Sequence, residues 1–301
     1  MNKKVIKSYK AFDKNMQCRG FQYEVGKEYE MIGHIECCKS GFHACESPLD
    51  VFDYYDMLES RFAEVEQSGT IDREEDTTKV CSSRIKIKAE LKLADIINIG
   101  VEWLKDIASP SKAKTGCALN DNGFEKKQIG SSGDYAKIGS SGYSAKIGSS
   151  GDYAKIGSSG YSAKIGSSGD SAKIGSSGDS AKIGSSGYSA QIGSSGDYAK
   201  IGSSGYSAQI GSSGDSAKIG SSGDYAQIDS TGEDSVIMCA GNNSMAKANV
   251  GSWITLAEWD WSDEKNRYVP VCVKTEYVDG EKIKSDTWYK LESGKFVEVT
   301  E

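Results

Sequence analysis

The chain has 301 residues, 37% of them hydrophobic, and a formal net charge of −7 at pH 7. No region carries an excess of lysine and arginine, which argues against nucleic-acid binding as a main activity. No stretch approaches the roughly 18 consecutive apolar residues of a membrane-spanning helix, and no apolar segment near the N-terminus is typical of a secretion signal, so we expect a cytoplasmic protein with no membrane partner.

Composition divides the chain into three regions. Residues 1–120 have the mixed sequence of an α+β domain, residues 121–250 contain a Gly- and Ser-rich repeat, and residues 251–301 are rich in aromatic and β-branched residues. We predict a mainly β protein: an α+β N-terminal domain, a β-solenoid, and a small C-terminal β-meander that caps the solenoid.

Local signals predict elements in the N-terminal region. Ser47 and Pro48 provide an N-cap residue and a first-turn proline, which indicates a short helix. Apolar residues alternate from Arg84 to Leu93, as in an amphipathic strand, and residues 94–107 return to helical spacing. Residues 108–128 are expected to connect this region to the repeat.

Potential metal ligands cluster between residues 37 and 45. They are Cys37, Cys38, His43 and Cys45. Tetrahedral zinc needs about four such ligands, but the paired Cys-x-x-Cys spacing is missing, and adjacent cysteines on a strand would point apart. We expect reduced thiols and no metal or other cofactor, and keep zinc at these four residues as the alternative.

The order of three polar features suggests an enzymatic alternative. Arg19, the segment around His43, and Glu64 or Glu66 are loosely similar to the ADP-ribosyltransferase pattern, which implies binding of a nicotinamide dinucleotide. The middle motif lacks the Ser, Thr or Tyr of that pattern. We therefore expect no catalytic residue, and Arg19, His43, Glu64 and Glu66 remain the residues of this alternative.

A nine-residue motif, Ile-Gly-Ser-Ser-Gly-(Asp/Tyr)-(Tyr/Ser)-Ala-(Lys/Gln), occurs eleven times between Ile129 and Ile228. A fixed short period indicates a solenoid. The Ala and Ile positions lie two apart with Lys or Gln between them, which predicts a strand with one apolar face. We expect Gly-Ser-Ser-Gly to form the corner, because glycine adopts positive φ without steric cost.

The residue two positions before each alanine, either Asp or Tyr, indicates the length of one coil. Identical residues align in 6 of 9 comparisons at a spacing of 18, against 2 of 10 at nine and 4 of 8 at 27. We therefore predict two nine-residue half-turns per 18-residue coil and a flattened two-sheet solenoid with an Ile and Ala interior.

This register predicts rows of exposed side chains. Tyr143 would lie over Tyr161, Tyr188 over Tyr206, Tyr135 over Tyr153, and Lys137, Lys155 and Lys173 would form a ladder. Tyrosine combines a large contact area with a low ordering cost at interfaces, so these nine residues are our candidate binding residues. The alternative is that the tyrosines only stabilise the rod and the lysines only form a solvated face.

The C-terminal region predicts strands over residues 253–261, 268–278, 282–291 and 296–299. Asp279-Gly280 lies between two of them and is typical of a hairpin turn. A β-meander here would cover the last coil, which otherwise exposes an apolar interior and unpaired strand edges.

Four sequence features are spread along the chain: Cys18-Arg-Gly-Phe-Gln-Tyr-Glu-Val-Gly-Lys27, Gly41-Phe-His-Ala-Cys-Glu46, the Ile-Gly-Ser-Ser-Gly repeat, and Gly251-Ser-Trp-Ile-Thr-Leu-Ala-Glu-Trp259. Together they resemble a group of uncharacterised proteins of bacteriophages and prophages from gut Firmicutes. The resemblance implies a phage accessory protein and supplies no catalytic residues.

We therefore expect a non-enzymatic protein that binds a host protein through its solenoid, in the host cytoplasm. By analogy, the partner belongs to an antiviral defence system and is inhibited. A structural or decoration role in the virion is an alternative, and the aromatic rows could also pair two copies as a homodimer. The sequence does not identify the partner.

Overall fold

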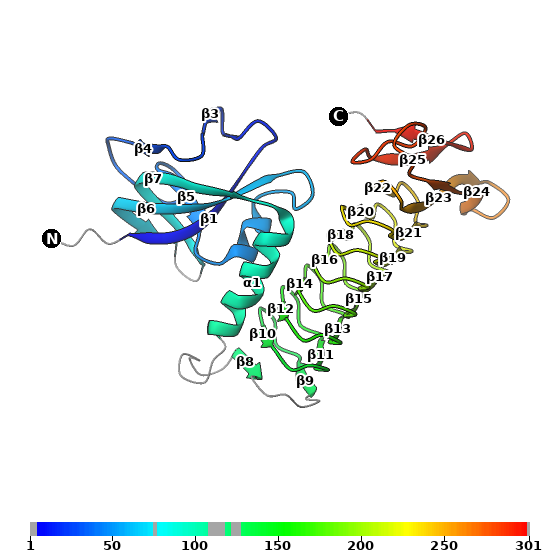
Figure 1. Ribbon diagram of the computed structural model, residues 1–301, viewed down its shortest axis with the longest axis horizontal. Helices are drawn as coiled ribbons and strands as arrows, with labels where there is room; N and C mark the ends of the chain where they lie inside the picture. The colour runs from blue at the N-terminus through cyan, green and yellow to red at the C-terminus, as the bar shows by residue number, and fades with distance from the viewer. Residues whose placement is uncertain (1–4, 75–76, 108–117, 122–127, 300–301) are drawn as a thin grey trace. The chain divides into compact units, whose positions relative to one another are not determined.

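A computed structural model describes residues 5–74, 77–107, 118–121 and 128–299 (Figure 1). The chain divides into two compact units, residues 1–103 and 104–301, and each contains an apolar core. The chain is mainly β, as predicted. Among the described residues, no helix has the length and apolar character needed to span a bilayer.

The N-terminal unit is built on five antiparallel strands in the order β4-β7-β5-β1-β6. Because β7 also pairs with β6, four of them close into a ring around a core that contains Phe12, Tyr23 and Ile85. The strands are β1 Ile6–Phe12, β4 Glu28–Glu30, β5 Phe42–Cys45, β6 Arg61–Arg73 and β7 Lys79–Leu91. Two short strands, β2 Gln17–Cys18 and β3 Phe21–Gln22, pair outside this sheet.

The ring is weakly closed at one seam. β1 pairs with β6 from Ile6 to Phe12, but it pairs with β5 only at Tyr9 and Cys45. Beyond that pair, the Lys10 ammonium donates a hydrogen bond to the His43 carbonyl oxygen, at 3.0 Å. A side chain therefore bridges the two strands where their backbone pairing has ended.

The elements predicted for this unit are present. A 3-10 helix, η1 Pro48–Asp53, begins after Ser47, whose hydroxyl donates to the Asp50 carboxylate at 2.7 Å. The α-helix α1 Leu93–Ile107 confirms the helical spacing, and β7 contains the predicted strand. Most of the predicted connection, residues 108–117 and 122–127, lies outside the described residues.

The repeat forms a β-solenoid of two parallel sheets, as predicted (Figure 1). The even-numbered strands form one sheet: β8 Ala118–Asp121, β10 Lys137–Ser140, β12 Lys155–Ser158, β14 Lys173–Ser176, β16 Gln191–Ser194, β18 Gln209–Ser212, β20 Gln227–Ser230 and β22 Met245–Ala248. The odd-numbered strands form the other: β9 Gln128–Ser131, β11 Lys146–Ser149, β13 Lys164–Ser167, β15 Lys182–Ser185, β17 Lys200–Ser203, β19 Lys218–Ser221, β21 Val236–Cys239 and β23 Trp253–Ser262. The solenoid thus continues beyond the last recognisable repeat.

Strand register confirms the 18-residue coil. Ile138 pairs with Ile156 in the even sheet, and Ile147 pairs with Ile165 in the odd sheet. The Ile and Ala side chains form the buried interior, as predicted. The last serine of each strand, such as Ser158, is also buried, because it lies two residues after the inward-facing isoleucine.

The predicted role of the repeat glycines was wrong. None of the described repeat glycines has positive φ, and the left-handed residue at most corners is instead the one before alanine, such as Tyr153 (φ 55°) or Ser171 (φ 52°). The second glycine of Gly-Ser-Ser-Gly is needed for space: a Cβ at Gly151 would lie 2.2 Å from the Gly133 carbonyl oxygen of the previous coil.

The C-terminal strands extend both sheets. β23 forms a hairpin with β24 Arg267–Tyr277 in the odd sheet, whereas β25 Tyr289–Glu292 and β26 Lys295–Glu298 join the even sheet. The expected meander is thus two separate hairpins. The predicted hairpin turn at Asp279-Gly280 was wrong: the Asp279 carboxylate accepts three backbone N–H bonds, at 2.8 to 3.0 Å, in a loop that crosses between the sheets.

Candidate functional site

Stacked tyrosines lie at the corners of the solenoid, in the predicted pairs. The ring centroids of Tyr135 and Tyr153 are 5.0 Å apart, those of Tyr143 and Tyr161 5.3 Å, and those of Tyr188 and Tyr206 5.1 Å, with interplanar angles of 7°, 10° and 9°. Each of these side chains is at least 40% exposed. The rings therefore support one another while leaving contact surface to solvent.

Two further tyrosines are exposed at the corners. Tyr225 extends the stack of Tyr188 and Tyr206, with its centroid 4.9 Å from that of Tyr206, and Tyr198 lies at a corner before an odd strand. Sequence reasoning did not single them out. Both directly precede an alanine, whereas Tyr206 lies two residues before one. Tyr225 therefore follows Tyr206 by 19 residues, and the 18-residue register alone does not align the two rings.

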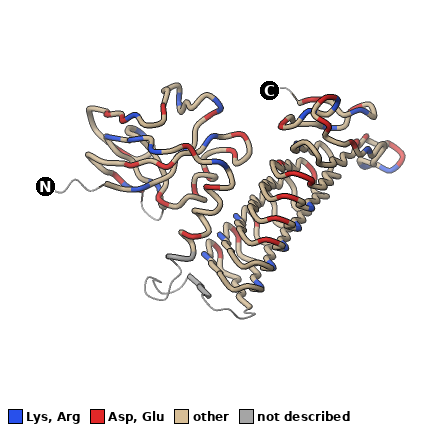
Figure 2. Tube along the Cα trace, viewed as in Figure 1, with Lys and Arg blue, Asp and Glu red and all other residues tan. Residues whose placement is uncertain are grey.

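Aspartates at the same corner position bind the next coil. The Asp134 carboxylate accepts the backbone N–H of Asp152 at 2.9 Å, and Asp152 accepts that of Asp170 at 2.8 Å. Rows of acidic residues consequently follow the solenoid (Figure 2). Aspartate thus joins coils by hydrogen bonding and tyrosine by stacking, so either residue at this position links neighbouring coils.

The lysines form two ladders that differ in exposure. In the even sheet, Lys137, Lys155 and Lys173 are in register, but Lys173 is buried and the other two are half-buried. In the odd sheet, the exposed ladder consists of Lys146, Lys164, Lys182, Lys200 and Lys218. The candidate ladder predicted from sequence is therefore the less exposed one.

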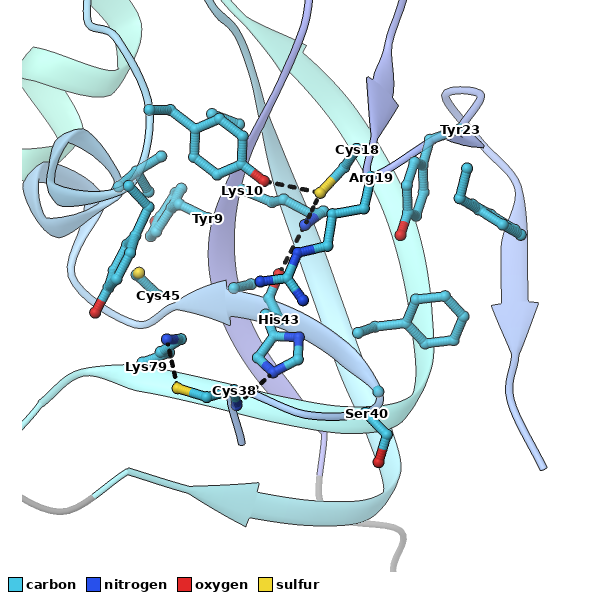
Figure 3. A pocket seen from close by; sticks show the side chains of 18 of the residues that line it. Tyr9, Lys10, Cys18, Arg19, Tyr23, Cys38, Ser40, His43, Cys45 and Lys79 are labelled. Carbon is cyan, nitrogen blue, oxygen red and sulfur yellow. Dashed lines mark hydrogen bonds between the residues drawn. The ribbon is translucent and has the colours of Figure 1, made fainter. Parts of the chain in front are cut away.

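The N-terminal unit contains a cavity of about 400 Å³ at the seam between β1 and β5 (Figure 3). Lys10 is only 4% exposed, and its ammonium contacts the Cys18 sulfur at 3.4 Å as well as the His43 carbonyl. Burial lowers the pKa of Lys10. Cys18 also contacts the Tyr55 hydroxyl at 2.8 Å, and burial raises the pKa of that tyrosine.

The opposite wall is held by a loop before β5. The Cys38 backbone N–H donates to His43 Nε2 at 2.9 Å, so this nitrogen is an acceptor and the imidazole is neutral. Burial and the charges of Lys10 and Lys79 lower the pKa of His43. Lys79 lies 3.0 Å from the Cys38 sulfur and 4.6 Å from the centroid of the Tyr54 ring.

Of the residues of the enzymatic alternative, only two lie at the same site. Arg19 and His43 both line the cavity. Glu64 and Glu66 lie on half-buried positions of β6 outside it, paired with Lys7 at 2.9 Å and Lys88 at 3.0 Å respectively. The described lining of the cavity contains no carboxylate that could act as the glutamate of an ADP-ribosyltransferase.

The four potential zinc ligands do not form one cluster either. The ligand atoms of Cys37, His43 and Cys81 lie within 4.8 Å of one another. Sequence reasoning missed Cys81 because it lies far along the chain on β7, where it pairs with His43 across the sheet. Cys38 points to Lys79 instead, and Cys45 lines the cavity. Three ligands fall short of the four of a structural zinc site, and burial raises the pKa of Cys81 to about 12, which disfavours the ligating thiolate.

A protein-family model described as a domain of unknown function (DUF7666) matches residues 6–99. The match spans the five-stranded sheet and the cavity of the N-terminal unit. Neither a curated protein nor a solved structure matches the chain.

Proposed function

We propose that the chain is a non-enzymatic binding protein that contacts a partner protein through the tyrosine rows of its solenoid. The observation that carries this proposal is the exposure of stacked tyrosine rings along the corners. Tyrosine is enriched among the residues that dominate binding energy at protein interfaces. A row of such rings offers a repeated contact surface on a regular scaffold.

Stacking lowers the entropic cost of binding. A surface side chain that loses its rotamer freedom at an interface costs about 0.5–1.5 kcal/mol. Tyr188 and Tyr206 already restrict each other at 5.1 Å, and both sit on backbone that is hydrogen-bonded to the neighbouring coil. Less freedom therefore remains to be lost when a partner covers them.

The resemblance to bacteriophage and prophage proteins supports a more specific proposal. In that setting the partner is a host protein, which the solenoid binds in the host cytoplasm and inhibits. The step from binding to inhibition is an analogy with other phage accessory proteins, since a bound rod obstructs whatever surface it covers.

Quantitative mass spectrometry of proteins recovered with the tagged full chain from bacterial host cells tests the proposal. We expect Tyr188→Ser combined with Tyr206→Ser to reduce recovery of the partner by about tenfold or more, the loss typical of hot-spot residues. The matched control is Tyr268→Ser, which removes an exposed tyrosine from β24, outside the repeat. Unchanged recovery together with a lowered melting temperature would mean that the stacks only stabilise the rod.

A further inference from the structure

The cavity of the N-terminal unit has an unusual charge composition for an acidic chain. Four cationic side chains line it, and its described lining includes neither Asp nor Glu. They are Lys10, Arg19, Lys39 and Lys79. The net charge of the whole chain is −7, so this concentration of positive charge is local.

Two of the four cations lack a carboxylate partner. Lys39 pairs with Glu36 at 2.6 Å and Lys79 with Glu74 at 3.5 Å. Among the described residues, neither Lys10 nor Arg19 has such a partner. A lysine that is only 4% exposed is normally paired, because desolvating an isolated ammonium is costly. An anion in the cavity would supply the missing counter-charge.

Arg19, an exposed residue that lines the cavity, has a backbone conformation that is unusual for a residue other than glycine. Arg19 (φ 51°) and Gly20 (φ 75°) join β2 to β3 with two consecutive positive φ values, as in a type I′ turn. Asn, Asp or Gly usually occupies the first of these positions, and an arginine there is sterically disfavoured. Figure 3 shows the Arg19 guanidinium directed toward His43. Such strain is concentrated at functional sites.

Aromatic rings form much of the remaining wall. Tyr23 and Tyr55 line the cavity, and their ring centroids lie 5.7 and 5.9 Å from the Lys10 ammonium. Phe21 makes an edge contact with Tyr23 at 4.8 Å and is 45% exposed at the cavity. A site that combines exposed ring surface with unpaired cations suits a ligand that carries both a planar ring and a negative group.

We propose that this cavity binds a small organic anion with a planar ring, the chemistry of a nucleoside phosphate. Lys10 and Arg19 contact the anionic group, and the aromatic wall, including Phe21, covers the ring. The cavity volume of about 400 Å³ lies within the range of small-molecule sites. This site is independent of the tyrosine rows of the solenoid.

Isothermal titration of the full chain with AMP, GMP, CMP and UMP, their nucleosides, and inorganic phosphate tests the proposal. We expect at least one monophosphate to bind with a stoichiometry of one, about tenfold or more tighter than both its nucleoside and inorganic phosphate. The absence of binding by all four monophosphates at about 1 mM overturns the proposal. So does equal binding by the nucleoside or by inorganic phosphate, because each removes one half of the required chemistry.

Variants locate the binding. Arg19→Gln is expected to weaken the bound monophosphate about tenfold or more, because it removes a charge-assisted hydrogen bond. Lys10→Met provides a second removal of positive charge, with circular dichroism to verify folding. The matched control is Lys27→Gln, an exposed lysine outside the cavity lining, which should bind as the wild type does. Wild-type affinity in both Arg19→Gln and Lys10→Met contradicts the assignment.

Discussion

At the scale of single residues, the two glycines of each repeat differ in how much space surrounds them. The first glycine of a strand in the odd sheet faces outward, and a Cβ at Gly184 would meet nothing within 4 Å. The glycine at the corner faces the previous coil, and a Cβ at Gly178 would lie 2.0 Å from the Gly160 carbonyl oxygen. One alanine substitution is therefore harmless and the other is not.

Gly178→Ala is expected to lower the free energy of unfolding by about 1–3 kcal/mol or more, because the coils must move apart to accept the methyl group. Gly184→Ala should leave stability unchanged or raise it by up to about 1 kcal/mol, since it only restricts the unfolded chain. Denaturant unfolding followed by circular dichroism measures both. Equal effects of the two substitutions would contradict the coil spacing described here.

Lys10 gives a pH-dependent prediction. Burial lowers its pKa in the folded state, so the unfolded state binds more protons between that pKa and the ordinary value of 10.5. The contribution of Lys10 to stability therefore rises with pH through this window and is lost as pH falls through the folded-state pKa. Lys10→Met removes this titration, so the stability of the variant minus that of the wild type should fall as pH rises from 7 toward 10.5.

Thermal or denaturant unfolding of both proteins over that pH range measures the difference. Other tyrosines, cysteines and lysines titrate in the same range, but they are common to the two proteins and cancel in the comparison. A difference that stays constant with pH would show that burial does not lower the pKa of Lys10.

At the scale of elements, those with a regular spacing of apolar residues could be predicted from the sequence. The helix α1, the strand β7 and every described repeat strand follow from apolar periodicity, because each buries a face that its own sequence marks. The cavity could not be predicted. It exists because β1 and β5 pair at a single position, and its side chains Lys10, Cys18 and Tyr55 come from separate segments whose approach depends on that irregular seam.

The cap shows the same limit. Asp279-Gly280 has the local sequence of a hairpin turn, yet the next strand pairs with β22 of the other sheet. Covering the apolar end of the solenoid overrides the local turn preference, because Val278, Ile283, Tyr289 and Leu291 complete its core. The two-sheet interior thus decides where the last strands go.

Tyr289→Ala should destabilise the solenoid by about 3–5 kcal/mol, the cost of removing a large side chain from a core, since Tyr289 is only 2% exposed. Tyr268→Ala changes the same residue type on β24, where the side chain is 52% exposed, and should cost less than about 1.5 kcal/mol through its contact with Trp261. Calorimetry compares the two. Similar melting temperatures for both variants would mean that β25 does not close the interior.

At the scale of the whole molecule, the repeat fixes architecture but not partner. Its sequence specifies an 18-residue coil, and the corners place tyrosines and aspartates in rows. Packing of the interior does not require an aromatic residue at these corner positions. The choice between Tyr and Asp is therefore open to selection for an external contact. The identity of the partner that we propose is set by the surface of that other protein.

Site-specific photo-crosslinking in host cells tests the central claim most directly. A photoreactive p-benzoylphenylalanine replaces Tyr206 in one version of the full chain and Tyr268 in another, and adducts are identified by mass spectrometry. We predict a discrete adduct with a host protein from position 206 and none from position 268. An adduct from position 268 alone, no adduct from either, or an adduct of twice the chain mass that contains only this protein would contradict binding of a partner protein by the tyrosine rows.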